Sequence, residues 1–180
     1  MNRRTVIPVL AFVLVAVLGG YASWPRQADL RGFEPDEIAR LETAMWRDYY
    51  QKRYAALFGH LYELSRTQFG FAPLDSFRIA LSAARAATAF QPTRSRAAAD
   101  AALPPLVTYY LLESAVPDGF DVAEAARLEL DWWQARREAL GPEQYGKTVA
   151  RVAAITYGKP ADDPSLLVSG VGRAEGYGLS

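Results

Sequence analysis

The chain has 180 residues, enough for one domain with its own hydrophobic core and an additional segment. Apolar residues make up 51% and charged residues 22%, which is ordinary for a globular protein and argues against disorder over most of the length. The 20 basic and 20 acidic residues balance, so no nucleic-acid partner is indicated, and the absence of cysteine excludes disulfides and thiolate metal sites.

Residues 1–23 have the pattern of an export or membrane-targeting segment. Two arginines precede an apolar run from Val6 to Leu18, and small residues follow. Tyr21 and Trp24 lie where an interfacial aromatic belt would lie, and the arginines favour a cytoplasmic N-terminus. We predict an uncleaved signal-anchor that spans the membrane once. The alternatives are a cleaved signal peptide and, less favoured by the pattern, a buried N-terminal helix.

The predicted location follows from this segment and from the composition. Alanine- and arginine-rich usage is typical of bacterial proteins. We therefore predict a protein of the bacterial envelope, anchored in the inner membrane with its helical domain on the periplasmic side. Residues 24–33 carry a proline, a glycine and three charges without a period, which predicts a linker.

The stretch from Glu34 to Gln68 predicts one long helix. Pro35 suits the first helical position, and no further proline occurs before Pro73. When the stretch is projected as an α-helix, with a rotation of about 100° per residue, its apolar side chains gather on one broad face. These are Ile38, Met45, Trp46, Tyr49, Tyr50, Ala56, Leu57, Leu61 and Leu64. Three polar residues, Glu42, Arg53 and His60, project into the middle of that face.

Four further helical segments are predicted in the rest of the chain. They cover about 73–90, 93–116, 122–140 and 142–157, and the second is interrupted at Pro104 and Pro105. Asp121 and Glu124 are spaced as a capping box. Residues 159–180 predict a flexible tail. Together these segments predict an all-α domain over 34–158, an irregular antiparallel bundle of about five helices preceded by the anchor helix.

The helix over 122–140 repeats the polar feature of the long helix. Glu129 and Arg136 fall within or beside its inner face, next to Trp133. One interpretation is structural: Glu42 pairs with Arg136 and Arg53 with Glu129, because buried charges persist when they are paired.

The other interpretation is a small-molecule site between the two helices, since an aromatic cavity with a few convergent polar groups is the usual form of such a site. Its candidate ligand-binding residues are Glu42, Trp46, Tyr49, Arg53, His60, Glu129, Trp133 and Arg136. Tyr109, Tyr110 and Glu113 could join the same interior from the third helical segment. The spacing of these residues selects no reaction, so no catalytic residue is assigned.

A carboxylate-bridged metal bundle would need a Glu-x-x-His sequence on each of two helices. The single histidine lies in His60-Leu61-Tyr62-Glu63, the reverse order, so neither a metal nor another cofactor is predicted.

We predict a membrane-tethered, exported helical module that binds a protein partner or assembles with one, without catalytic activity. The alternative is a module that binds a small apolar or aromatic ligand, with or without chemistry. Complete pairing of the inner charges favours the first, and an unpaired group at a cavity favours the second.

Overall fold

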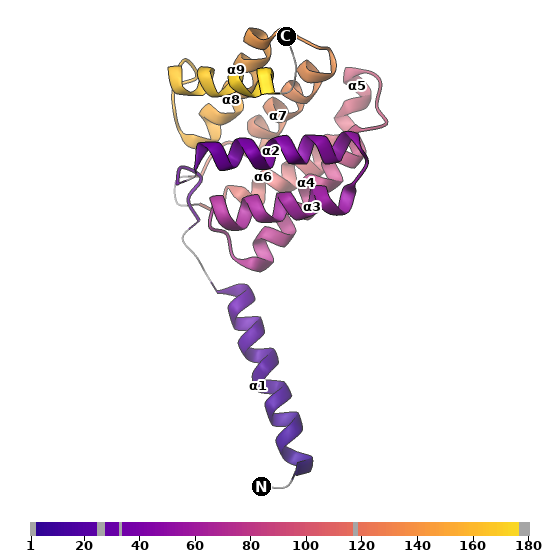
Figure 1. Ribbon diagram of the computed structural model, residues 1–180, viewed down its shortest axis with the longest axis vertical. Helices are drawn as coiled ribbons and strands as arrows, with labels where there is room; N and C mark the ends of the chain where they lie inside the picture. Colours follow the sequence, from indigo (N-terminus) through magenta and orange to yellow (C-terminus); the bar gives the residue numbers. More distant parts are fainter. Residues whose placement is uncertain (1–2, 25–27, 33, 117–118, 177–180) are drawn as a thin grey trace.

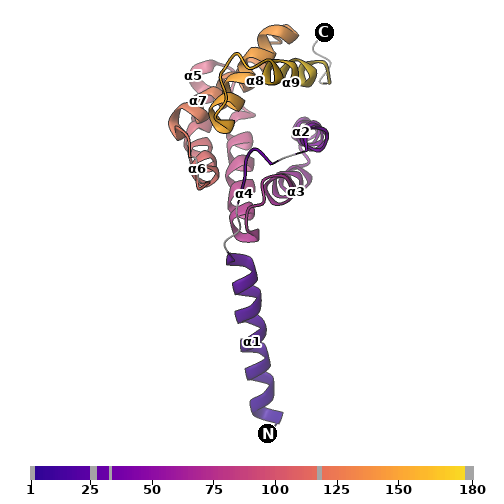
Figure 2. The ribbon, with the colours of Figure 1, turned by 90° about the vertical axis from the view of Figure 1, so that its left-hand side faces the viewer.

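The computed structural model describes residues 3–24, 28–32, 34–116 and 119–176. All regular structure in these residues is helical, so the all-α prediction is confirmed for them. Helix α1 (Arg3–Ser23) extends away from the other helices, which together form one body (Figure 1). Helix α4 runs through the middle of this body, with α2 and α3 on one side and α6 and α7 on the other (Figure 2).

Helix α1 exposes its apolar side chains. Phe12 is 75% exposed, and Ile7, Val15 and Leu18 are exposed as well. Within the described part of the chain, none of the helices combines the length and the hydropathy of a membrane-spanning segment. This finding does not support the predicted membrane anchor.

The long helix predicted over residues 34–68 is wrong, because the chain folds there into a helical hairpin. Helix α2 (Pro35–Tyr50) is followed by α3 (Tyr54–Glu63) and by a π-helical turn, η1 (Leu64–Gln68). Lys52 takes a left-handed conformation with φ 56°. The Arg53 N–H then donates to the Asp48 carbonyl at 2.8 Å and the Lys52 N–H to the Tyr49 carbonyl at 3.1 Å, which is the Schellman pattern of a helix end.

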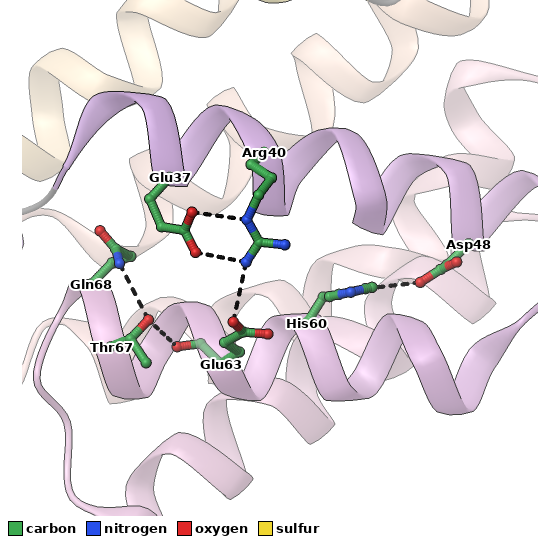
Figure 3. Close-up of polar contacts among 7 residues, drawn as sticks. All are labelled: Glu37, Arg40, Asp48, His60, Glu63, Thr67 and Gln68. Carbon is green, nitrogen blue, oxygen red and sulfur yellow. Dashed lines mark hydrogen bonds and ion pairs between the residues drawn. The ribbon is translucent and has the colours of Figure 1, made fainter.

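Polar side chains hold the two arms of this hairpin together. The carboxylate of Asp48, 1% exposed, lies 2.5 Å from the Arg53 guanidinium and 2.9 Å from His60 Nδ1. Figure 3 shows the contact of Asp48 with His60 and, further along the hairpin, Arg40 bridging Glu37 on its own helix and Glu63 on α3. No glycine or proline lies at the turn, so the sequence contains no helix-breaking residue at the point where the predicted long helix is interrupted.

The next helices agree with the sequence more closely. Helix α4 spans Pro73–Phe90 as predicted, and α5 (Arg96–Ala99), a 3₁₀ turn η2 (Asp100–Ala102) and α6 (Leu103–Glu113) follow. The two prolines that were expected to interrupt this segment lie in the first turn of α6. A missing backbone N–H leaves no hydrogen bond unmade in that turn.

The last helices are α7 (Val122–Arg137), α8 (Pro142–Tyr157) and α9 (Pro164–Gly176). The predicted N-cap of α7 is confirmed, since the Asp121 carboxylate accepts a hydrogen bond from the Glu124 N–H at 2.9 Å. Helix α7 ends before the predicted Leu140, because Ala139 turns left-handed with φ 53°. Helix α8 ends at Gly158 as predicted, with φ 61°.

Helix α9 lies in the segment for which a flexible tail was predicted, and it packs on α8 (Figure 1). The two helices cross at glycines. A Cβ atom placed on Gly170 would lie 2.5 Å from the carbonyl oxygen of Gly146. This close approach needs the absence of side chains at both positions, and the sequence pattern of α9 alone does not reveal it.

The largest core cluster joins α2, α3, α4, α6, α7 and α8. Its buried members are mostly alanine, leucine and aromatic residues, with Trp133, Tyr49, Tyr110 and Phe90 as the largest. Small residues on α4 and α7 let the helices approach closely, while the aromatic side chains fill the space where several helix ends meet. The candidate site lies within this cluster.

Candidate functional site

A cavity of about 150 Å³ lies where α2, α3, α4, α6, α7 and α8 come together. Its wall is largely apolar and aromatic, with glutamates and tyrosine hydroxyls as the main polar groups. The lining residues are Leu30, Glu42, Met45, Trp46, Tyr49, Leu57, Leu61, Leu64, Phe69, Ala83, Ala87, Leu106, Tyr109, Tyr110, Glu113, Glu129, Trp132, Trp133, Val149, Val152, Ala153, Thr156 and Tyr157.

Tryptophan and tyrosine rings form much of this wall. The ring centroids of Trp46 and Trp132 lie 5.1 Å apart, and those of Trp46 and Trp133 lie 6.1 Å apart. On α6, Tyr109 and Tyr110 lie 4.8 Å apart. All three pairs meet edge to face, the arrangement that the ring quadrupoles favour. The contacts fix the rings against one another, so the wall is preformed.

Glu129, on α7, accepts hydrogen bonds from neutral tyrosine and tryptophan side chains. The Tyr110 hydroxyl donates to Oε2 at 2.8 Å and the Trp133 indole N–H donates to Oε1 at 2.9 Å. Burial raises the pKa of Glu129, the hydrogen bonds from Trp132, Tyr110 and Trp133 oppose that rise, and the charge of Glu42 adds to it. The raised pKa means that the site favours the neutral form of this carboxyl more than water does.

Glu113, at the end of α6, is the most unusual polar group of the cavity. Its side chain is 4% exposed, and among the described residues its Oε1 atom has no hydrogen-bond partner. Burial raises the pKa of Glu113 to about 8, a hydrogen bond with Tyr109 works against this rise, and the nearby charge of Glu129 adds to it. An unsatisfied buried oxygen destabilises a fold by about 1–3 kcal/mol, so a ligand group that forms a hydrogen bond with this atom would be favoured.

The basic residues predicted for the site lie elsewhere. Arg53 and His60 both bind Asp48, and the Arg53 side chain is 54% exposed. The predicted pair of Arg53 with Glu129 is therefore wrong, because the break in the helix turns Arg53 away from the apolar face. Neither Arg53 nor His60 lines the cavity.

Arg136 lies beside the aromatic wall without lining the cavity. Its Nε donates to the Tyr50 hydroxyl at 3.0 Å. Its guanidinium lies 5.2 Å from the centroid of the Trp46 ring and 5.4 Å from that of Tyr50, within the range of cation–π attraction. Its predicted pair with Glu42 stays a prediction.

The other candidate residues come together as the sequence suggested. Glu42, Trp46, Tyr49, Glu129 and Trp133 all line the cavity. So do Tyr109, Tyr110 and Glu113, which were proposed to join them from the third segment.

Sequence reasoning missed one part of the site and one buried contact outside it. The contribution of α8, through Val149, Val152, Thr156 and Tyr157, was not assigned to it. The spacing of these residues on one helical face was the available signal. Asp48, which binds both Arg53 and His60, was also missed, because nothing in its spacing distinguishes it from a surface acid.

Two further observations bear on the class of the site. Within the described residues, no group of three or more histidine, aspartate or glutamate side chains is arranged to hold a metal ion. Comparisons with protein-family models, curated proteins and solved structures find no match for this chain. Its function is therefore inferred from its own residues.

Proposed function

We propose that this helical module binds a small apolar or aromatic molecule in the cavity between α2 and α7. The observation that carries the proposal is the preformed aromatic cavity with Glu113 at its wall, whose buried Oε1 has no hydrogen-bond partner in the described part of the chain. An apolar pocket with a few convergent polar groups is the usual form of a ligand site. This is also the arrangement that favours a ligand site over a set of purely structural ion pairs.

The size of the cavity limits the ligand. A cavity of about 150 Å³ lined by apolar side chains accepts a molecule of about the size of benzene. The ligand is therefore a single ring or a compact alkyl group with one small polar substituent. Nothing in the site requires a reaction, and binding alone is what we propose.

The tryptophans provide a direct test with benzyl alcohol as the probe. Trp46, Trp132 and Trp133 line the cavity, whereas the fourth tryptophan, Trp24, is 70% exposed. The replacement Trp24→Phe removes the fluorescence of the tryptophan outside the cavity. We expect benzyl alcohol to change the remaining tryptophan fluorescence in a saturable way. The absence of a saturable change up to the solubility of the probe would refute the proposal.

A matched pair of variants tests whether the signal comes from the cavity. Ala87, on α4, lines the cavity, and leucine at that position occupies part of its volume. Thr88 is exposed on the same helix. We expect Ala87→Leu to weaken benzyl alcohol binding at least tenfold and Thr88→Leu to leave it unchanged. Equal binding by both variants would place the probe elsewhere.

We also propose that α1 attaches the module to a membrane, with the helical body on the periplasmic side of a bacterial inner membrane. The exposed apolar side chains of α1, including Phe12 and Leu14, support this, because water disfavours such a surface. The test is flotation of the full chain with phospholipid vesicles. The wild type should float and the Leu14→Arg variant should float less, and a wild-type chain that stays at the bottom of the gradient would refute the attachment.

A further inference from the structure

The charged side chains that line the cavity in the described structure are all acidic, while Arg136 lies beside the aromatic wall. Glu42, Glu113 and Glu129 line the cavity, and among the described residues that form the wall there is no lysine, arginine or histidine. Glu113 is 4% exposed and its Oε1 lacks a hydrogen-bond partner within the described structure. The cavity therefore combines an excess of carboxyl groups with a buried oxygen atom that has no hydrogen-bond partner among the described residues.

We propose that the ligand is a small organic amine, bound in its ammonium form by Glu113 and Glu129 and enclosed by the aromatic wall. This inference rests on the proposed function, since it names the chemical class of the ligand for the same cavity. An ammonium group carries several N–H donors and one positive charge. It therefore supplies a hydrogen-bond partner for the Glu113 oxygen and a positive charge for the carboxyl groups of the wall.

The hydrogen bonds already made inside the cavity fit this assignment. Glu129 is held by the hydroxyl of Tyr110 and the indole of Trp133, which orient a carboxylate without neutralising it. Each carboxylate oxygen can accept more than one hydrogen bond. Glu129 thus has acceptor capacity left for a ligand beyond its hydrogen bonds with Tyr110, Trp132 and Trp133.

The aromatic rings supply a second attraction that is specific for cations. A cation within about 6 Å of a tryptophan or tyrosine ring face is attracted by the ring quadrupole, and more strongly where water is excluded. Trp46, Tyr49 and Trp132 all line the cavity. The protein already shows this interaction at its edge, where the Arg136 guanidinium lies 5.2 Å from the Trp46 ring centroid.

The titratable groups around Glu113 make binding dependent on pH. Tyr109 faces it on its own helix, Glu129 lies on α7, and Glu42 from α2 and Tyr157 from α8 line the same cavity. None of these groups brings a positive charge. An ammonium therefore favours the deprotonated form of Glu113, and its binding releases a proton below the pKa of about 8. The affinity for a cation should rise by up to about tenfold per pH unit from pH 6 to pH 8.

The experiment compares three probes of similar size on the full-length wild-type chain. Benzylammonium, benzyl alcohol and benzoate share a ring and differ in charge, and their dissociation constants can be measured by tryptophan fluorescence and calorimetry at pH 6 and pH 8. We expect benzylammonium to bind at least about tenfold more tightly than benzyl alcohol at pH 8. Benzoate should bind more weakly than either.

Each outcome decides between the two proposals. If benzyl alcohol binds as tightly as benzylammonium, or if the preference does not grow with pH, the amine assignment is overturned while the ligand cavity stands. If none of the probes binds, the proposed function is overturned with it. Measurements on the wild type decide these points without a variant.

A variant then identifies the anion. Glu113→Gln keeps the shape of the side chain and removes its charge, so it should reduce the preference for benzylammonium over benzyl alcohol by about tenfold. Glu124→Gln, an exposed change on α7, is the control and should leave the preference unchanged. A preference that Glu113→Gln leaves intact would overturn the role of Glu113. If Glu113→Gln fails to fold, Glu129→Gln provides the same test for the second carboxyl.

Discussion

The replacement Glu113→Gln should make the empty protein more stable at alkaline pH. In the unfolded chain the carboxyl loses its proton near its ordinary pKa of 4.5, whereas in the folded protein burial raises that pKa to about 8. The folded state therefore binds one more proton than the unfolded state between these two values. Stability from this group is fully present below pH 4.5 and is lost as the pH rises towards 8.

The magnitude follows from the width of that window. Between pH 5 and pH 8.5 about 3 pH units lie inside it, and each unit changes the free energy of unfolding by about 1.4 kcal/mol. The wild type should therefore lose about 4 kcal/mol over this interval through Glu113 alone. Glu129 shifts in the same direction and adds to the loss. The glutamine amide does not titrate, so the variant should lose about 4 kcal/mol less than the wild type.

Urea unfolding followed by circular dichroism at pH 5 and pH 8.5 measures this difference. The full chain is kept in a nonionic detergent because α1 exposes apolar side chains. The control is Glu124→Gln, whose exposed side chain should leave the pH dependence within about 0.5 kcal/mol of the wild type. A Glu113→Gln variant that loses as much stability as the wild type, within about 1 kcal/mol, would show that Glu113 is ionised in the folded protein and would refute the reasoning.

Three further predictions concern the fold and use the same unfolding measurement. Asp48→Ala removes the buried carboxylate that holds the hairpin and should destabilise the protein by about 2–3 kcal/mol. Arg40→Ala, at an exposed ion pair, should have a much smaller effect, and equal effects would contradict the role of Asp48. Lys52→Gly relieves a left-handed lysine and should stabilise by about 1 kcal/mol, so a loss of stability would count against the turn as described. Gly170→Ala places a methyl group against the Gly146 backbone and should destabilise the protein by about 1–3 kcal/mol. Gly59→Ala, in open space on α3, should stabilise the protein by about 0.5–1 kcal/mol. The reverse order of these two effects would mean that α8 and α9 do not cross at Gly170.

The helices whose ends were predicted correctly are those that begin or end at a typical capping or helix-terminating residue. Proline at the start of α4 and α8, Asp121 before α7 and Gly158 after α8 each stand at an observed helix end. These residues act through their own backbone geometry or through a bond to a neighbour, so their effect can be read locally.

The hairpin of α2 and α3 could not be predicted in this way. Its turn places Lys52 in a conformation that glycine favours, and the buried contact of Asp48 with Arg53 and His60 favours the reversal. Those contacts depend on where the chain goes after the turn. A periodic pattern that continues through the break, as from Tyr49 to Leu57, therefore indicates one helix where there are two.

The same distinction explains the candidate site. Aromatic residues and glutamates on the faces of α2 and α7 were assigned correctly to a shared interior, because helical periodicity places them there. Arg53 was misplaced with the hairpin. The position of Glu113 depends on the direction of α6 relative to α7, which is a tertiary property, so the sequence could name it as a candidate but could not distinguish it from a surface residue.

The stability of the ligand-free protein and its affinity for an amine both depend on the free energy of ionising the buried Glu113. At alkaline pH the folded protein holds a deprotonated Glu113 that burial disfavours, and a bound ammonium would relieve that penalty. A ligand at about one hundred times its dissociation constant stabilises the folded state by about 2.7 kcal/mol. At a fixed concentration, benzylammonium should therefore stabilise the protein more at pH 8.5 than at pH 5, whereas benzyl alcohol should stabilise it equally at both. If the amine stabilised more at pH 5, the unmet hydrogen bond of Glu113 and its raised pKa would reflect the packing of the core and not recognition of a cation.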